Sequence, residues 1–235
     1  MRFFAKDSTY YNKLMAEKPV IGYWGIQGRA AGARVLLRHL GVDFENKCYE
    51  MGAEGPGSWK EDKESLGINF PNIPYYKDGD VFHSETVSIL RSICRKYKPE
   101  YLGRNLVEQS KADALGAAIG DAFFKWAGAN VFPADYKDKK EAGRAEAEGL
   151  LATVATCIGD GPFLAGELTY ADFGLMLPLM TVKMYDETLI SGNETIAGYL
   201  TRFMAVEGME AALAEENKLL LLPPFAGLQA DNMPA

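Results

Sequence analysis

The stretch 68-INFPNIPYYKDGDVFHS-84 decides the fold of this chain. Two short runs of strand-forming residues, Tyr75–Lys77 and Asp80–Phe82, flank Asp78-Gly79, which is a favoured two-residue turn between antiparallel strands. Pro74 stands directly before the first run. The stretch therefore predicts a tight hairpin that is entered from a proline.

A helix N-terminus is expected directly after this hairpin. His83-Ser84 opens a segment with helical periodicity, and Ser84 is a good N-cap residue. The free N–H groups at such an end attract anions, and the irregular Ile73-Pro74 segment leaves the N–H and C=O of Ile73 to pair with an extended peptide. The corner thus fits a small acidic peptide, although the same residues also fit an ordinary hairpin followed by a helix.

The residues around the hairpin predict a thioredoxin-like domain. Upstream, Lys18–Trp24 and Val42–Tyr49 are expected strands, and Ala30–Leu40 between them has apolar residues at helical spacing. Downstream, Glu85–Tyr97 is expected to be a helix. The order β-α-β, an irregular segment, then β-β-α is the thioredoxin-like arrangement, in which the proline before the third strand, here Pro74, is cis.

The end of the first strand carries a tyrosine where a redox member of this fold needs a cysteine. Tyr23 is a hydrogen-bond donor at neutral pH, because a phenol has a pKa of about 10. Donation to a thiolate favours the ionised thiol, and the positive charge of Arg29 acts in the same direction. The corner is therefore expected to bind another molecule's thiol and keep it ionised, unless Tyr23 is only a half-buried strand aromatic. The three cysteines form no CxxC pair, which argues against a disulfide oxidoreductase.

The composition is that of an ordinary globular protein, with 48% hydrophobic residues, 24% charged residues and a net charge of −7. This acidic balance without a basic cluster argues against nucleic acid or an anionic membrane as partner. Two histidines and three widely spaced cysteines predict no metal site. No apolar run approaches the roughly 20 residues of a membrane span, and residues 1–17 lack the apolar core of a signal peptide. The cytosol is therefore the expected compartment.

The second half of the chain predicts an all-helical domain. The expected segments are a linker over Pro99–Gly103, helices over Asn105–Asn130, Tyr136–Gly159, Ile196–Met204 and Met209–Ala214, and an irregular tail over Leu219–Ala235. Thr169 and Asp172 have the spacing of a capping box at the start of one more helix.

The expected protein is thus of the α+β class with two domains. A thioredoxin-like domain over residues 18–98 follows an N-terminal extension at residues 1–17. An all-α domain over residues 104–225 precedes a C-terminal tail at residues 226–235.

Three segments carry a resemblance to a known family. They are VIGYWGIQG at residues 20–28, SWKEDKESLGINFPNIPYY at residues 58–76 and FLAGELTYADF at residues 163–173. In these segments the chain resembles the cytosolic glutathione transferases, and among them most closely the mu class. The resemblance implies an enzyme of detoxification that conjugates the glutathione thiolate to hydrophobic electrophiles. It also implies a cytoplasmic homodimer that needs no cofactor, with glutathione as co-substrate.

The resemblance implies roles for individual residues. Tyr23 matches the catalytic tyrosine that hydrogen-bonds the glutathione sulfur, and Ser84 matches the serine that binds the γ-glutamyl carboxylate. Asp121 matches an aspartate that reaches the ammonium group of the glutathione bound to the partner subunit, although it also fits a solvated surface carboxylate. The implied glutathione-binding residues are Tyr23, Trp24, Arg29, Trp59, Lys63, Asn72, Ile73, Pro74, His83, Ser84 and Asp121.

The electrophile pocket is expected between the domains, where ligand sites commonly lie. Its expected walls are Trp24, Ile26, Phe124, Val131, Phe132 and Phe225. The chain departs from the family pattern at His83, where a glutamine is usual, and at Gln27, where the mu class has an arginine. Val131 stands where the mu class often has a second tyrosine, which leads to the hypothesis of weaker assistance to epoxide opening.

Two other functions on the same fold stay open from the sequence. A glutathione-dependent isomerase or synthase uses the same thiolate, so only its products would distinguish it from a conjugating enzyme. A non-catalytic carrier of hydrophobic ligands does not need a thiol-activating group, and the presence of Tyr23 argues against it.

Overall fold

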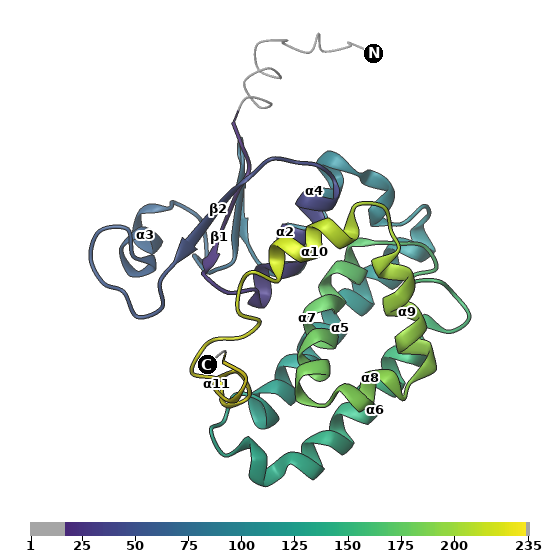
Figure 1. The fold of residues 1–235 in the computed structure, drawn as a ribbon. Coiled ribbons are helices and arrows are strands. Elements are labelled where there is room, and N and C mark those ends of the chain that lie inside the picture. The colour runs from purple at the N-terminus through teal and green to yellow at the C-terminus, as the bar shows by residue number, and fades with distance from the viewer. Residues whose placement is uncertain (1–16, 234–235) are drawn as a thin grey trace.

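A four-stranded mixed sheet forms one end of the protein and helices form the remainder (Figure 1). The computed structural model describes residues 17–233, so the expected extension at residues 1–17 lies almost wholly outside it. The strands are β1 (Val20–Trp24), β2 (Glu45–Tyr49), β3 (Tyr75–Asp78) and β4 (Val81–Ser84), in the sheet order β2-β1-β3-β4. β1 runs parallel to β2 and antiparallel to β3, and β3 is antiparallel to β4. This topology confirms the predicted thioredoxin-like domain.

The hairpin begins its turn one residue later than the sequence predicted. Asp78 pairs with Val81, so the two turn residues are Gly79-Asp80. The reason is that the Asp78 carboxylate belongs to the interior, where it accepts hydrogen bonds from the hydroxyls of Tyr76 (2.6 Å) and Tyr97 (2.8 Å). A buried, fully partnered carboxylate is more favourable here than an exposed turn aspartate. The predicted cis bond before Pro74 is confirmed.

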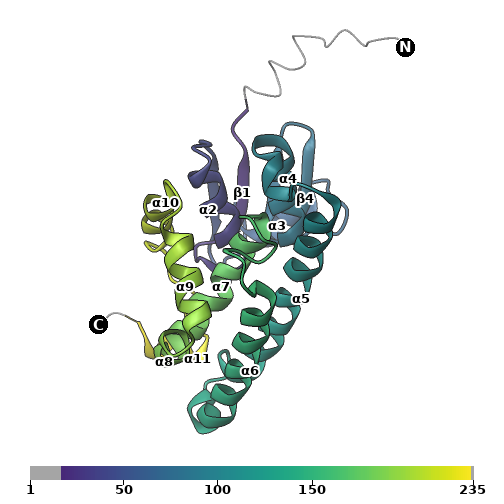
Figure 2. The ribbon, with the colours of Figure 1, turned by 90° about the vertical axis from the view of Figure 1, so that its right-hand side faces the viewer.

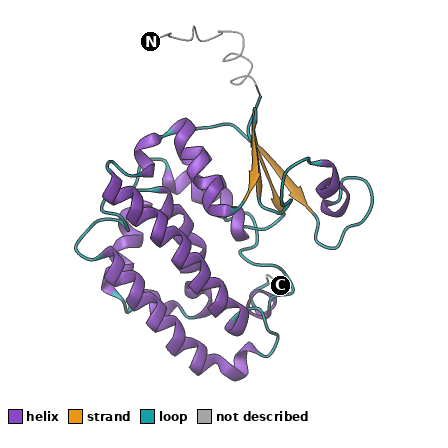
Figure 3. Ribbon diagram, turned by 180° about the vertical axis from the view of Figure 1, so that it is seen from behind, coloured by secondary structure: helices purple, strands orange, loops and turns teal. Residues whose placement is uncertain are grey.

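The helices of the first domain cover the sheet unequally. They are the 3₁₀ turn η1 (Gly28–Ala30) and the helices α2 (Ala31–His39), α3 (Trp59–Ser65) and α4 (Thr86–Tyr97). α2 and α4 pack together and bury their apolar stripes. α3 buries no residue completely and stands apart from the other helices beside the sheet (Figure 3).

The second domain is entirely helical, as predicted. Its elements are η2 (Pro99–Leu102), α5 (Leu106–Asn130), η3 (Tyr136–Lys139), α6 (Lys140–Ile158), α7 (Tyr170–Tyr185), α8 (Glu187–Ser191), α9 (Glu194–Met204), α10 (Met209–Glu216) and α11 (Gly227–Asp231). α5 and α6 extend away from the sheet side by side, and α7 packs against α5, α2 and α4 (Figure 2). α8 was not predicted, and α11 lies in the tail that was expected to be irregular. α11 forms because its first residues find main-chain partners at the end of α5.

The capping box at the start of α7 is confirmed. The Asp172 carboxylate accepts hydrogen bonds from the N–H of Thr169 (2.8 Å) and the N–H of Leu164 (3.1 Å). It also accepts one from the Tyr199 hydroxyl (3.0 Å), and the whole aspartate is buried. The box therefore joins α7, α9 and the preceding loop as well as capping a helix.

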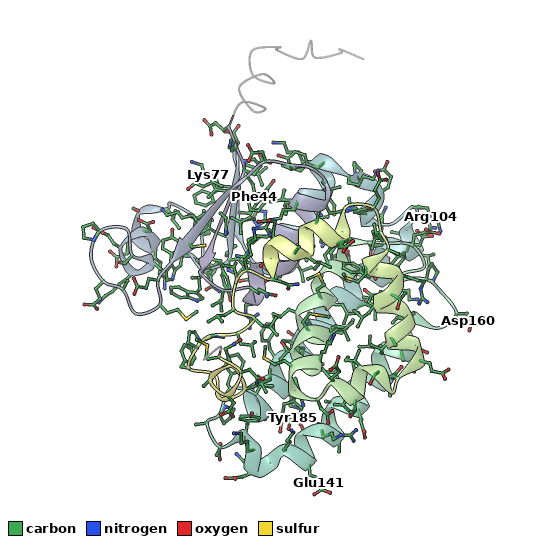
Figure 4. The ribbon with its side chains drawn as sticks, in the orientation of Figure 1. Phe44, Lys77, Arg104, Glu141, Asp160 and Tyr185 are labelled. Carbon is green, nitrogen blue, oxygen red and sulfur yellow. The ribbon has the colours of Figure 1, made fainter. Side chains whose placement is uncertain are left out.

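The chain passes from the first domain to the second through η2. We propose a first domain over residues 18–98, as expected from the sequence, and a helical domain over residues 104–233, which extends past the expected end at 225 because it includes α11. Exposed charged residues such as Glu141 and Asp160 point outward from this domain (Figure 4). Across residues 17–233, no helix combines the length and the apolar character needed to cross a membrane.

Candidate active site

A cleft of about 240 Å³ lies where the two domains face each other. Its walls come from the start of α2, the start of α4, the middle of α5 and the first half of α7. The residues that line it include Gly28, Arg29, Glu85, Thr86, Asp121 and Phe124. One region of the cleft is polar and charged, and the rest is apolar.

The polar region is built on the N-terminus of α4. Glu85 stands between β4 and α4 with a φ of 77°, a conformation that L residues rarely adopt. Strain of this kind concentrates at ligand sites, because the surrounding structure must hold it in place. Thr86 then begins the helix, and both residues line the cleft. The first N–H groups of a twelve-residue helix are therefore presented at the cleft.

The structure does not place the predicted pair His83-Ser84 at this helix end. Ser84 is the last residue of β4, where it pairs with Tyr75, and its hydroxyl donates to the carbonyl of Phe70 (3.2 Å). The His83 ring contacts the Ser84 carbonyl (2.9 Å) and the Ser92 hydroxyl (2.8 Å). The predicted helix start at Glu85 and the predicted N-cap Ser84 each lie one residue too early, because the strand continues through Ser84.

The Tyr23 corner lies next to the cleft. Tyr23 is 7% exposed, and its hydroxyl oxygen accepts a hydrogen bond from the N–H of Arg29 (3.2 Å). A Cβ atom at Gly28 would lie 2.9 Å from this oxygen, so only glycine lets the chain pass so closely, and its φ is 42°. Burial raises the pKa of Tyr23, and the hydrogen bond from Arg29 opposes that effect. Tyr23 is thus a neutral phenol with a hydrogen to donate.

Arg29 connects this corner to the helical domain. Its guanidinium carbon lies 3.4 Å from the centroid of the Phe124 ring, which is a cation–π contact. Both side chains line the cleft, and Asp121 lines it one helical turn before Phe124. The sequence-predicted residues Arg29, Asp121 and Phe124 are therefore brought together.

Two predicted tryptophans line a second hollow, of about 220 Å³. Trp24 lies at the end of β1, and Trp59 at the start of α3, where it stacks on Tyr75 with ring centroids 6.3 Å apart. The Asp62 carboxylate holds α3 to the sheet by accepting a hydrogen bond from the Tyr49 hydroxyl (2.9 Å). Lys63 is exposed on the same helix.

The cis-proline corner is more closed than the sequence indicated. The side-chain oxygen of Asn72 accepts the N–H of Ile73 at 2.9 Å, so this N–H already has a partner. Ile73 and Pro74 are buried. The expectation that both main-chain groups of Ile73 are free is therefore wrong for its N–H.

The six predicted electrophile residues do not line one shared cavity among those described above. Ile26 and Val131 are buried, and Phe225 is 71% exposed. The N–H of Leu228, in α11, donates to the Val131 carbonyl (3.1 Å), and the N–H of Gly227 donates to the Phe132 carbonyl (3.0 Å). The end of the chain thus covers the position at which the mu class often has a tyrosine. Sequence periodicity did not show this contact, because it depends on where the tail folds back.

The fold and the corner together define a class of protein. A thioredoxin-like domain with a tyrosine at the end of β1, a cis-proline segment and an attached helical domain is suited to hold a thiol without exchanging disulfides. Within residues 17–233, no three His, Cys, Asp or Glu residues group as metal ligands.

Comparison with known proteins gives the family. A glutathione S-transferase of Tyrophagus putrescentiae is 33% identical over 220 residues, which span 90% of this chain and 97% of the relative. Glutathione S-transferase Mu 2 of Homo sapiens is 29% identical over 87% of this chain and 94% of its own. The crystal structure of the glutathione S-transferase Blo t 8 matches with a TM-score of 0.77 at 27% identity, over 88% of this chain and 98% of that chain. No protein-family model matches. The chain belongs to the glutathione S-transferase family, and its relatives include mu-class enzymes.

Proposed function

We propose that Tyr23 donates its hydroxyl hydrogen to the sulfur of bound glutathione and stabilises the thiolate that attacks a hydrophobic electrophile. The supporting observation is the buried Tyr23 hydroxyl, whose oxygen already accepts the Arg29 N–H at 3.2 Å. Because that oxygen accepts a hydrogen bond, its own hydrogen becomes a stronger donor. The sulfur then forms a bond to carbon while the leaving group departs or an epoxide oxygen takes up a proton.

The γ-glutamyl end of glutathione carries a carboxylate and an ammonium group, and the polar region of the cleft suits both. We propose that the N-terminus of α4, the Thr86 hydroxyl and Arg29 bind the carboxylate. Glu85 lines the same cleft and suits the ammonium. Asp121 lines it too, which departs from the sequence expectation that Asp121 serves the glutathione of the partner subunit. This assignment replaces His83 and Ser84, whose polar atoms are directed to Ser92 and Phe70.

Substitution of the helix-opening residue tests the assignment. We expect Thr86→Val to raise KM for glutathione about tenfold, because it removes one charge-assisted hydrogen bond, with little change in kcat. Steady-state kinetics with glutathione as the varied substrate measure this. Ser84→Ala is the matched variant and should leave KM within twofold. If Ser84→Ala raises KM and Thr86→Val does not, the carboxylate binds at Ser84 instead.

The remaining predicted contacts are proposals of the same kind. We propose that Trp24, Trp59 and Lys63 contact the glycyl end, which the hollow lined by the two tryptophans supports. We propose that the main chain of Ile73 before Pro74 pairs with the cysteinyl unit, which requires Asn72 to release the Ile73 N–H. We propose Phe124 as one wall for the electrophile, and the cytosol as the compartment, which suits three free thiols.

We further propose that the enzyme is a homodimer. Phe70 is 91% exposed and is held at a φ of 52°, with its carbonyl fixed by the Ser84 hydroxyl. A large aromatic side chain held out into solvent is typical of an anchor in an interface.

We expect Phe70→Asn to convert the dimer to monomers while the chain stays folded, because asparagine accepts the positive φ but offers no apolar anchor. Sedimentation analysis measures the change in mass. Met204→Ser, at an exposed methionine on α9, is the control and should remain dimeric. A dimer that persists in Phe70→Asn at micromolar concentration would exclude Phe70 as the anchor.

A direct test of the function is the conjugation of glutathione to 1-chloro-2,4-dinitrobenzene by the purified protein, followed together with glutathione binding by calorimetry. Binding with turnover supports the transferase. Binding without turnover of any electrophile would refute conjugation.

A further inference from the structure

A buried ion pair joins the two domains directly behind the Tyr23 corner. Arg34, in α2, and Glu216, at the end of α10, are both fully buried, and the Arg34 Nε lies 3.0 Å from each Glu216 oxygen. α10 lies alongside α2 in the ribbon views (Figures 1 and 2). Burying such a pair carries a large desolvation cost, and apolar residues of similar volume often give equal or greater stability. Stability alone therefore does not account for this pair.

Besides pairing with Glu216, Arg34 binds the main chain of the loop that follows β1. Its Nη2 donates to the carbonyls of Ile26 (2.7 Å) and Gln27 (2.9 Å). The same Nη2 also lies 2.5 Å from Glu216 Oε1, so the carboxylate and the two carbonyls share the hydrogens of one nitrogen. The orientation of the planar guanidinium therefore ties the carboxylate to both carbonyls. Glu216 thus sets the position of Arg34, and Arg34 sets the position of the loop that follows β1.

The other edge of this loop is held by the same part of the chain. The N–H of Gln27 donates to the Leu220 carbonyl (2.7 Å), and the N–H of Gly28 donates to the Leu221 carbonyl (3.1 Å). The Gln27 side chain donates to the Leu219 carbonyl (3.0 Å). Residues 216–221, which lie almost 200 positions later in the sequence, therefore hold both edges of the loop at residues 26–28.

The residue that follows this loop is Arg29, whose N–H donates to the Tyr23 hydroxyl oxygen. A shift of the loop would lengthen this 3.2 Å hydrogen bond, which is already near the limit of a useful one. Arg34 also lies close enough to Tyr23 for its charge to lower the pKa of Tyr23.

We propose that Arg34 and Glu216 are positioning residues for the reaction: through them the end of the helical domain fixes the loop at residues 26–28 and so holds the Arg29 N–H against Tyr23. The inference rests on the proposed role of Tyr23 as the donor to the thiolate. Under this proposal, α10 and residues 217–221 affect the ionisation of the bound thiol, although neither of them lines the cleft.

Glu216→Gln tests the proposal, because glutamine keeps the shape but loses the charge that orients Arg34. We expect the pH midpoint of enzyme-bound glutathione thiolate, measured by ultraviolet difference absorbance, to rise by about half a unit or more. We expect kcat at pH 6.5 to fall several-fold, while the dissociation constant of glutathione changes less than twofold.

Two control variants separate positioning from loss of stability. Arg38→Gln removes the other ion pair of Glu216, at 2.6 Å, but does not touch the loop. Asp172→Asn weakens the buried capping box of α7, whose hydrogen bonds to Thr169, Leu164 and Tyr199 involve no residue of the loop. Both should lower the melting temperature and leave the thiolate midpoint unchanged. If Glu216→Gln does not fold, Gln27→Ala replaces it, because it removes only the hydrogen bond to the Leu219 carbonyl. This variant should raise the pH midpoint of the bound thiolate by a smaller amount.

The proposal is overturned if a folded Glu216→Gln keeps the wild-type midpoint, or if a control of equal melting temperature shows the same shift. With Gln27→Ala as the only folded variant, an unchanged midpoint overturns it. Tyr23→Phe in the same titration distinguishes the role of Tyr23 as donor from the positioning role of Arg34 and Glu216. If Tyr23→Phe raises the midpoint and Glu216→Gln does not, only the positioning role fails. If Tyr23→Phe itself changes nothing, the role of Tyr23 in the proposed function fails.

Discussion

Tyr23→Phe is expected to lower kcat for 1-chloro-2,4-dinitrobenzene by about 10- to 100-fold at pH 6.5 and to leave glutathione affinity nearly unchanged. The phenol contributes one hydrogen bond to a charged sulfur, and such bonds contribute about 1.5–3 kcal/mol. The loss falls on kcat because the donor stabilises the thiolate rather than the peptide. Initial rates across pH, for the wild type and the variant side by side, measure the effect.

The direction of the pH shift follows from the same bond. A donor that prefers the thiolate lowers the pKa of the bound thiol below its usual value of about 8.5, so its removal raises the pH midpoint of activity by about one to two units. At high pH the two enzymes should converge, because both thiols are then ionised. Tyr101→Phe is the matched control: its hydroxyl contacts His39 at 2.8 Å, away from the cleft. An unchanged profile in Tyr23→Phe would refute the thiolate role.

Asp172→Ala is expected to lower the free energy of unfolding by about 3 kcal/mol or more. The change leaves the N–H groups of Thr169 and Leu164 and the hydroxyl of Tyr199 without their buried acceptor. Chemical denaturation with urea, at constant m-value, measures the loss. Asp160→Ala, at an exposed aspartate after α6, is the control and should change stability by less than about 0.5 kcal/mol. A loss below 1 kcal/mol in Asp172→Ala would show that the box contributes little to the fold.

The pH dependence of this effect has a definite sign. Burial raises the pKa of Asp172 to about 6, against 3.8 for the ordinary group, while its hydrogen bonds oppose that shift. The folded protein therefore binds this proton more tightly than the unfolded chain does. The proton-linked part of the stability from Asp172 is fully present below pH 3.8 and is lost as the pH rises through about 6. Unfolding measured from pH 4 to 7 should show a negative slope from this residue that Asp172→Asn removes.

Local sequence patterns predicted much of the fold. The strand-forming run at Tyr75–Lys77, the glycine after residue 78 and the spacing of Thr169 and Asp172 each depend on residues a few positions apart, and each identified its element correctly. Where these patterns failed, they misplaced the boundary of an element by one residue. The hairpin turn was placed one residue early because the sequence does not show that Asp78 is buried under two tyrosines.

That small error changed the candidate site. When β4 extends through Ser84, the helix begins at Thr86, and the residues presented at the cleft become Glu85 and Thr86. The apolar stripe of the helix could not have found them, because Ile89 lies three residues after Thr86 and four after Glu85, and both spacings are helical. The positive φ of Glu85 could not be read from the sequence, because glutamate has no preference for that conformation.

The sequence by itself determined the corner proposed to bind the thiol, because Tyr23 at the end of a strand and Pro74 before another are features of short segments. Only the tertiary structure decided what surrounds that corner. Arg34 and Glu216 are 182 residues apart, and the main chain of residues 219–221 carries no side-chain pattern that marks it as a partner of the loop at residues 26–28. Such contacts form because packing α10 on α2 removes both charges from water, where each then requires the other.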